Sequence, residues 1–258
     1  MREILAADGL RKTFRLSAKQ QQIQRTKSKT KVAVEGLSFS AYEGEIFGLL
    51  GPNGAGKTTT LRMLATLIRP DSGDATVDGA SIVKNPEKVR AKIGFLTSEL
   101  KLEDFFTPSY LFDFFSNLHR VEPAVSRRRK GELFARFGVD EFAEVKVSNL
   151  STGMKQKLSL VISIVHDPGI IIFDEPTNGL DVLTAKVVTD FLSELRDQGK
   201  SIIVSTHIFS LAEKLCDRIG IIIDGKMAAC GALRDVMAAQ TLEERFFDIY
   251  LEVMGDTA

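Results

Sequence analysis

The chain has 258 residues, of which 44% are hydrophobic and 26% are charged, and its formal net charge at pH 7 is zero. This is the composition of a globular protein with enough residues for a large core. The balanced charge gives no global basic field for nucleic acid, so we expect no such partner. No apolar run approaches the about 20 residues that span a bilayer, and no apolar signal region follows Met1. We expect a soluble protein that stays inside the cell, with its two cysteines reduced.

The first hundred residues alternate short apolar runs with turn signals. They predict strands over residues 5–10, 32–39, 46–50, 75–77 and 93–96, and helices over residues 58–68 and 86–92. From about residue 105 to 142 the pattern is helical. After residue 151 the alternation resumes, with strands expected over 170–173, 201–204 and 219–223 and helices over 183–196 and 209–215. The simplest fold class is an α/β core interrupted by a helical insertion.

Two segments are unusually basic. Residues 15–31 contain six lysines or arginines and no acidic residue. We expect a solvated hairpin or flexible loop there, with contact to lipid headgroups or a protein partner as the alternative. Residues 127–130 read Arg-Arg-Arg-Lys and predict the charged face of a helix.

Residues 51–58 read Gly-Pro-Asn-Gly-Ala-Gly-Lys-Thr and fit the phosphate-loop pattern G-x-x-x-x-G-K-[ST] at every required position. They lie between a predicted strand and a predicted helix, which is the context that this motif requires. The glycines let backbone N–H groups turn toward one anion, and the helix N-terminus adds partial positive charge. Lys57 is placed to reach the outer phosphates, and the Thr58 hydroxyl is placed to ligate Mg²⁺. The motif predicts that the chain binds a nucleoside triphosphate.

Two carboxylates follow the apolar run Ile-Ile-Ile-Phe at residues 170–173. An acidic residue at the carboxyl end of such a strand faces the phosphate site, so Asp174 is placed to hold Mg²⁺ through its water shell. Glu175 is placed to orient or deprotonate the attacking water as a general base. His207 ends the next predicted strand, where it would reach a γ-phosphate.

A second helix start follows residue 150, where the sequence reads Ser-Thr-Gly-Met and becomes helical. Ser151 is a good N-cap, and Gly153 lets a ligand approach the backbone. Standing alone, this stretch would be an ordinary capped helix. Beside the phosphate loop, it is a second helix N-terminus able to bind phosphate, although it has no lysine of its own.

Together these motifs, in this order, closely resemble the ATPase subunit of ATP-binding cassette (ABC) transporters over essentially the whole chain. The resemblance implies a P-loop core with an antiparallel β subdomain over about residues 1–97 and 165–258, and an inserted α-helical subdomain over about 98–164. It implies ATP and Mg²⁺ as cofactors and a head-to-tail homodimer, or a pair with a second ATPase subunit, that holds two ATP molecules. It also implies an integral membrane permease as partner and a location at the cytoplasmic face of the cell membrane.

The resemblance assigns roles to individual residues. Catalysis would rest on Glu175, His207 and Lys57, and Mg²⁺ would be held by Thr58, Asp174 and Ser98. Phe14, the aromatic residue nearest the first strand, would stack on adenine. The family's signature matches residues 150–154 and its D-loop matches residues 179–181. The remaining nucleotide-binding residues would be Gly51, Pro52, Asn53, Gly54, Ala55, Gly56, Lys57, Thr58, Thr59, Ser151, Gly153 and Asp181.

The chain departs from the family pattern at two places. The usual signature is Leu-Ser-Gly-Gly-Gln, whereas Thr152 and Met154 stand here; Ser151 and Gly153 are kept, so phosphate binding should survive. The usual glutamine after the strand at residues 93–96 falls on Ser98, with Glu99 beside it. Serine is too short for the glutamine's reach, which leaves open whether Glu99 or a water completes the metal shell.

The segment of residues 105–115 holds six aromatic side chains. In the family, this region receives a helix of the membrane subunit. Most of these aromatics are expected to fill the core of the helical subdomain, with a few exposed as a docking surface.

The variant signature resembles bacterial exporters of the ABC-2 type, and among these a sodium-efflux ATPase subunit. The substrate, whether Na⁺ or a drug, lipid or peptide, is chosen by the membrane partner. The main alternative is a non-transport ABC ATPase of translation or DNA maintenance. The single cassette and the absence of sustained heptads count against it.

Overall fold

The computed structural model describes residues 2–23, 26–97 and 102–255. Its centre is a six-stranded sheet in the order β10-β9-β3-β8-β7-β6. The strands are β3 (Ile46–Leu50), β6 (Ile93–Leu96), β7 (Ile170–Asp174), β8 (Ser201–Thr206), β9 (Arg218–Ile223) and β10 (Lys226–Ala232). All neighbours are parallel except β10, which pairs antiparallel with β9. Every residue of β3, β7 and β8 is buried, as expected for parallel strands that are covered on both faces.

Alternate residues of the central strands enter two different hydrophobic clusters. In β7, Ile171 and Phe173 pack with helices α4 to α8 and α10, whereas Ile170 and Ile172 pack with α2 and the second sheet. This two-residue period places one layer on each face of the sheet. The helices of the core are α2 (Lys57–Leu64), α3 (Pro86–Arg90), α7 (Val182–Asp197), α8 (Phe209–Leu215), α9 (Leu233–Met237) and α10 (Leu242–Gly255).

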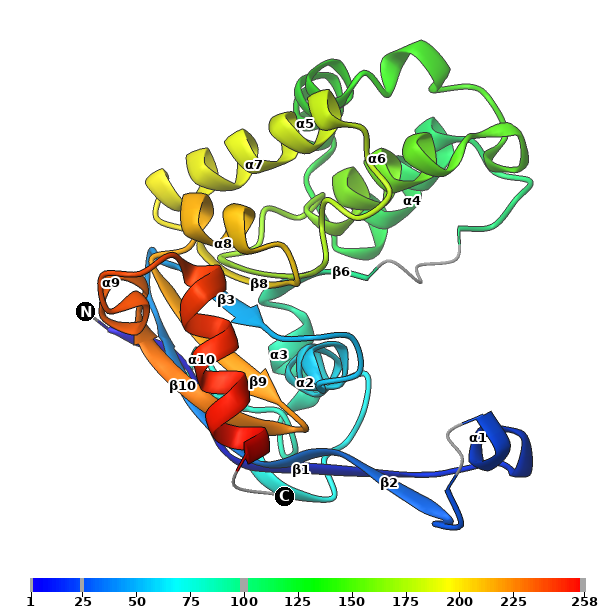
Figure 1. Cartoon of the computed structure of the whole chain (residues 1–258). Helices are drawn as coiled ribbons and strands as arrows, with labels where there is room; N and C mark the ends of the chain where they lie inside the picture. The colour runs from blue at the N-terminus through cyan, green and yellow to red at the C-terminus, as the bar shows by residue number, and fades with distance from the viewer. Residues whose placement is uncertain (1, 24–25, 98–101, 256–258) are drawn as a thin grey trace.

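The second sheet is antiparallel and has the order β2-β1-β4-β5. Its strands are β1 (Glu3–Arg15), β2 (Thr30–Tyr42), β4 (Ser72–Val77) and β5 (Ala80–Ser81). β1 and β2 are longer than the sequence predicts, because they remain paired through several register shifts out to Arg15 and Thr30. The short helix α1 (Ala18–Ile23) lies at the end of this hairpin, which projects away from the body of the molecule (Figure 1).

The helical subdomain is formed by α4 (Pro108–Leu118), α5 (Pro123–Phe137) and α6 (Thr152–Ser163), with the 3-10 turns η1 (Asp140–Phe142) and η2 (Val147–Asn149). Proline stands in the first turn of both α4 and α5, where it has no helical hydrogen bond to lose. Figure 1 shows these helices grouped on the side of the sheet away from the antiparallel strands. The predicted fold class, an α/β core with an antiparallel subdomain and a helical insertion, is confirmed.

Further local features differ from the sequence expectation, among them the end of α2 and the elements β10, α9 and α10, which were not predicted. The helix expected over residues 58–68 ends at Leu64, because Thr66 adopts a φ of 60° and the Ile68 N–H returns to the Arg62 carbonyl. A β-branched residue is a poor signal for this left-handed turn. The C-terminal helix α10 was not expected; its buried face, with Leu242, Phe246 and Ile249, joins the main core. Within the described residues, no helix has the length and hydropathy of a membrane span.

Candidate active site

The glycine loop joins β3 to α2 and is packed tightly against two other strands. A Cβ on Gly51 would lie 2.3 Å from the Ile222 carbonyl oxygen, and a Cβ on Gly56 would lie 2.4 Å from that of Ala33. Gly56 also has a φ of 108°, which L side chains rarely adopt, and it caps the N-terminus of α2. Glycine is therefore required at both ends of the loop, and the helix begins with its N–H groups toward the loop centre.

Lys57 turns back into this loop. Its Nζ donates to the carbonyl oxygens of Gly51 at 2.6 Å and Pro52 at 3.2 Å, and it lies 3.9 Å from Oε1 of Glu175. The side chain is only 5% exposed. Burial lowers the pKa of this ammonium below its usual range, while the charges of Glu175 and Asp174 oppose that shift. One buried cation thus lies between the loop and the carboxylates.

Asp174 ends β7 as a buried carboxylate that accepts hydrogen bonds from two hydroxyls. Thr58 Oγ1 donates to its Oδ1 at 3.1 Å, and Ser205 Oγ donates to the same atom at 2.5 Å. A hydroxyl and a carboxylate oxygen at the start of α2 fit the oxygen ligands of Mg²⁺, which takes one or two protein carboxylates and completes its shell with water and phosphate. The described residues contain no cluster of three His, Cys, Asp or Glu side chains that could hold a metal ion.

Glu175 follows immediately and has a φ of 51°, which is uncommon for a side chain of this size. Its backbone N–H is held by Ser205, through Oγ at 3.0 Å and the carbonyl oxygen at 3.2 Å. Nδ1 of His207 lies 3.1 Å from Glu175 Oε1. The strained turn therefore directs this carboxylate toward Lys57 and His207, and backbone strain held by surrounding contacts is typical of active sites.

A cavity of about 260 Å³ opens over the glycine loop. Three residues of the β1–β2 hairpin line it: Ala33 and the cross-strand partners Phe14 and Lys31. The Phe14 ring is 38% exposed, so a planar group has access to it. Lys31 was not identified from the sequence; only its pairing with Phe14, which depends on the hairpin register, reveals it. The cavity is lined by Phe14, Lys31, Ala33, Pro52, Asn53, Gly54, Ala55, Gly56, Lys57, Thr58, Thr59 and Glu175.

Six of the sequence-assigned residues that the structure describes do not line this cavity. Gly51, Asp174 and His207 nevertheless contact residues that do, namely Lys57, Thr58 and Glu175. The other three lie at the starts of α6 and α7. Ser151 is exposed and caps α6 by accepting from the Met154 N–H at 3.3 Å. Gly153 has open space around it. Asp181 caps α7; hydrogen bonds from Thr184 and Leu183 hold the pKa of its carboxyl below its usual range. Ser98 and Glu99 lie outside the described residues, so the structure does not place them.

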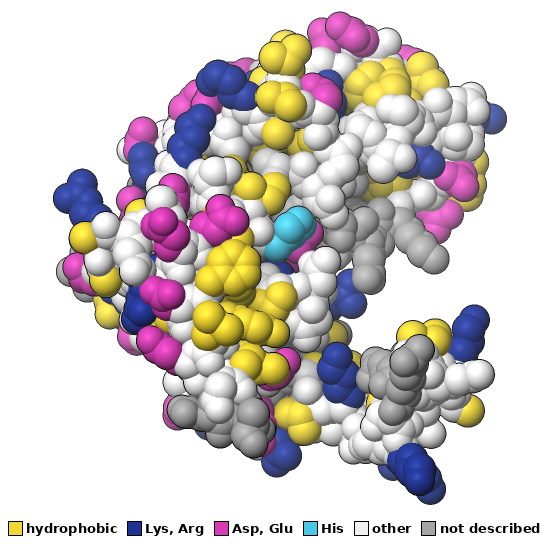
Figure 2. All heavy atoms as spheres, viewed as in Figure 1, with side chains coloured by type: hydrophobic (Ala, Val, Ile, Leu, Met, Phe, Trp, Pro, Cys, Tyr) yellow, Lys and Arg dark blue, Asp and Glu magenta, His cyan; other side chains and the backbone are white. Residues whose placement is uncertain are grey.

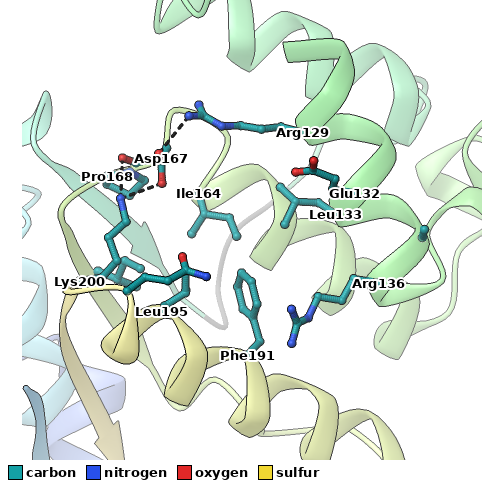
Figure 3. Close-up of a pocket in the computed structure, with 13 residues that line it drawn as sticks. Arg129, Glu132, Leu133, Arg136, Ile164, Asp167, Pro168, Phe191, Leu195 and Lys200 are labelled. Atoms are coloured by element: carbon teal, nitrogen blue, oxygen red, sulfur yellow. Dashed lines mark hydrogen bonds and ion pairs between the residues drawn. The ribbon is translucent and has the colours of Figure 1, made fainter. Parts of the chain in front are cut away.

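A larger cavity, about 660 Å³, lies between α5 and α7 (Figure 3). It has an apolar floor that includes Phe191 and a rim on which Arg129 and Lys200 both pair with Asp167. None of the residues assigned to nucleotide binding, metal binding or catalysis lines it. We place the chemistry at the smaller cavity, because only there do a phosphate-binding loop, a buried lysine and two carboxylates converge.

The glycine loop between a buried parallel strand and a helix defines a P-loop ATPase. The family model described as ABC transporter matches residues 34–178. The ABC transporter ATP-binding protein NatA of Bacillus subtilis is 37% identical over 219 residues, which are 84% of this chain and 89% of that protein. The linearmycin resistance ATP-binding protein LnrL of the same organism is 37% identical over 206 residues, 80% of this chain and 66% of that protein.

Solved structures agree with this assignment. The ATP-binding subunit of an ABC transporter superposes with a TM-score of 0.83 at 26% identity and covers 96% of this chain and 99% of its own. A bacterial ABC transporter cassette solved as a dimer has a TM-score of 0.77 at 25% identity and covers 89% of this chain and 99% of its own. The chain belongs to the ABC transporter family, as an ATP-binding and ATP-hydrolysing subunit of the exporter type. The relatives do not support the alternative of translation or DNA maintenance.

Proposed function

We propose that this ATPase works as a head-to-tail pair, with itself or with a second ATPase subunit, and drives export through a separate membrane permease. One observation carries the proposal. Lys57 and Glu175 line one cavity and His207 contacts Glu175 there, whereas Ser151, which is exposed, and Gly153, which is half-buried, lie outside it on the helical subdomain. A second copy would bring its own exposed helix N-terminus to the phosphates and complete the site.

In each copy, different residues would bind the phosphates, the adenine and the Mg²⁺. The loop from Gly51 to Thr59 would surround the phosphates with backbone N–H groups, and Phe14 would stack on adenine. Thr58 and Asp174 would hold Mg²⁺, with Ser98 or its neighbour as a further ligand outside the described residues. The bound Mg²⁺ would neutralise charge that develops on the phosphate oxygens.

Hydrolysis would rest on Glu175. Its carboxylate would orient the attacking water and accept its proton, while Lys57 stabilises charge on the outer phosphates. His207, 3.1 Å from the same carboxylate, would reach the γ-phosphate from the end of β8. The Ser205 hydroxyl would hold both carboxylates in position, since it donates to Asp174 and accepts from the Glu175 N–H.

The permease would bind an aromatic surface formed by α4 and the turn before it, and this contact would hold the chain at the cytoplasmic face of the membrane. Phe105, Tyr110 and Phe114 are 62%, 49% and 48% exposed. With Phe106 they form a continuous series of ring contacts between 4.3 and 6.4 Å. The resemblance of the variant signature to sodium-efflux subunits supports Na⁺ as the exported substrate.

The test is the substitution Glu175→Gln. We expect hydrolysis to fall by about 100-fold or more, because a general base typically contributes a factor of about 10² to 10⁴. ATP binding should survive, and gel filtration with ATP and Mg²⁺ should show a dimer that is scarce without ATP. Hydrolysis at the wild-type rate would refute Glu175 as the base. A trapped protein that remains monomeric would refute the composite site.

A further inference from the structure

The hairpin between β1 and β2 carries an exposed basic arm, which we define as residues 15–23 and 26–31. Figure 1 shows it projecting from the sheet, and none of its described side chains is buried. Its helix α1 has only six residues, which is too short to be stable by itself in water. Ile23, at its end, is 70% exposed. An arm of this kind is expected to gain order from a surface that covers it.

The charge of the arm indicates what that surface carries. Its described part contains Arg15, Lys19, Lys27, Lys29 and Lys31 and no acidic residue. Where the structure describes the chain, none of these five cations lies within ion-pair distance of a carboxylate. Five unpaired cations on one projection repel each other and favour an acidic binding surface.

The arm begins at the rim of the nucleotide cavity. Phe14 and Lys31, the last pair but one of the β1–β2 ladder, both line that cavity. A surface that covers the phosphates from outside would therefore lie next to the arm. In the proposed pair, this surface is the end of the second copy's helical subdomain that carries Ser151.

This end of the subdomain has an acidic edge, which we define as Glu103, Asp104 and Glu144. All three are exposed. Backbone hydrogen bonds join the two loops that carry them: Ser148 N–H donates to the Asp104 carbonyl at 2.9 Å, and Val147 N–H donates to that of Phe106 at 2.9 Å. Lys155, in the helix that Ser151 caps, lies 3.7 Å from Asp104. The acidic edge is thus fixed beside the signature.

We propose that the basic arm of one copy binds the acidic edge of the other copy when ATP closes the pair. Within one chain, the arm and the helical subdomain stand on opposite sides of an open hollow, and acidic side chains border its upper side (Figure 2). The second copy's helical subdomain would occupy the region over the glycine loop, and the arm would extend along its acidic edge. The contact occurs twice in the pair, once for each arm. The inference rests on the proposed head-to-tail pair.

The first test reverses charge on the arm without touching the nucleotide cavity. In the Glu175→Gln background, Lys27→Glu/Lys29→Glu should raise the dissociation constant of the ATP dimer about tenfold, because each of two contacts turns repulsive. Analytical ultracentrifugation with ATP and Mg²⁺ measures it. The effect should shrink toward 1 M salt, where screening acts within about 3 Å. The matched reversal Lys84→Glu/Lys88→Glu, also exposed but outside the arm, should change the constant less than twofold.

The second test identifies the surface by exchanging charge between two chains. Glu103→Lys/Asp104→Lys alone should also weaken the homodimer. When the arm variant and the edge variant are mixed, however, both contacts in the mixed dimer become complementary again. We expect mixed dimers to exceed homodimers at least tenfold, measured with differently sized fusion tags. A contact between arm and edge of the same chain could not be restored by mixing.

The outcomes separate this inference from the proposed function. If Glu175→Gln alone does not dimerise with ATP, the composite site fails and takes the arm contact with it. If it dimerises, but the arm reversal leaves the constant unchanged or mixing shows no preference, the arm contact alone is overturned. It is also overturned if the arm reversal changes only sedimentation with vesicles of phosphatidylcholine and phosphatidylglycerol, since the arm would then serve an anionic membrane.

Discussion

The glycine-loop half of the site and the signature half are built in opposite ways. In the first, Lys57 and Asp174 are buried, and the glycines pack against backbone carbonyl oxygens of two neighbouring strands. In the second, Ser151 is exposed, and a Cβ added at Gly153 would have nothing within 4 Å. The first half is fixed by the core of its own chain. In the second half, Ser151 is constrained as the N-cap of α6, but nothing within 4 Å requires a glycine at position 153. A requirement for glycine there must therefore come from what this half binds.

The largest effect on the glycine-loop half is expected from Gly56→Ala. The new Cβ would meet the Ala33 carbonyl oxygen at 2.4 Å in a left-handed conformation, so the loop must move. We expect a loss of about 1–3 kcal/mol in the free energy of unfolding and at least about tenfold weaker ATP binding, since charge-assisted hydrogen bonds to the phosphates are lost. Denaturant titration and fluorescent-nucleotide titration measure the two effects.

Gly36→Ala provides the control, because Gly36 has a φ of 67° but open space for a side chain. It should share part of the stability loss and leave ATP affinity unchanged. Equal ATP affinity in the Gly56→Ala variant would show that the loop tolerates displacement, and the first half would then be less rigid than we infer.

A somewhat smaller effect is expected from Ser205→Ala. The Ser205 hydroxyl of β8 holds both acidic residues at the end of β7, since it donates to Asp174 and accepts from the Glu175 N–H. Its removal should lower the rate of hydrolysis about tenfold, because Asp174 and Glu175 each lose one hydrogen bond that orients them. ATP affinity should stay within about threefold of the wild-type value. Steady-state ATPase assays over a range of ATP concentration separate the two.

Ser201→Ala is the matched change at the other end of β8, where the hydroxyl accepts from the Gly44 N–H. It should alter stability without a comparable loss of rate. If both variants hydrolyse ATP equally well, Ser205 has only a structural role.

These cases show what the sequence could predict. Lys57 and Asp174 follow from motifs, because a glycine loop and an acidic strand end have fixed geometry within one short segment. Ser205 and Lys31 depend on register between strands far apart in sequence: Asp174 pairs with Ser205, and Phe14 pairs with Lys31. Such registers are set by the whole sheet, so no local pattern contains them.

Gly153→Ala tests the signature half, with a smaller effect that is confined to the pair. Gly153 lies in the first turn of α6 with open space for a Cβ, so the substitution should leave the fold intact or stabilise it by up to about 1 kcal/mol. ATP affinity of the monomer should not change. Dimer formation in the Glu175→Gln background should weaken about tenfold, because the added methyl group would approach the partner's phosphates. An unchanged dimer would remove Gly153 from the composite site.

The smallest effect on ATP binding and hydrolysis by the isolated chain is expected from a substitution in the aromatic segment of residues 105–115. This segment, like the two halves of the site, contains both buried and exposed residues. Phe112 is fully buried and packs edge-on against Phe134 at 5.5 Å, whereas Phe105 is 62% exposed. The expectation that most of the six aromatics fill the core is wrong: only Phe112 is fully buried, Phe106 and Phe115 pack partly against the core, and the other three are exposed. Phe112→Ala should cost about 3–5 kcal/mol of stability. Phe105→Ala should cost little and leave ATP affinity and the ATPase rate of the isolated chain unchanged.

The Phe105→Ala variant should nevertheless lose co-purification with the membrane subunit, because an exposed aromatic of this size is a typical interface anchor. Thermal unfolding of both variants first separates stability from binding. Undiminished co-purification of a stable Phe105→Ala chain would place the permease on another surface. Such a result would leave both halves of the ATP site as described, because Phe105 belongs to neither of them.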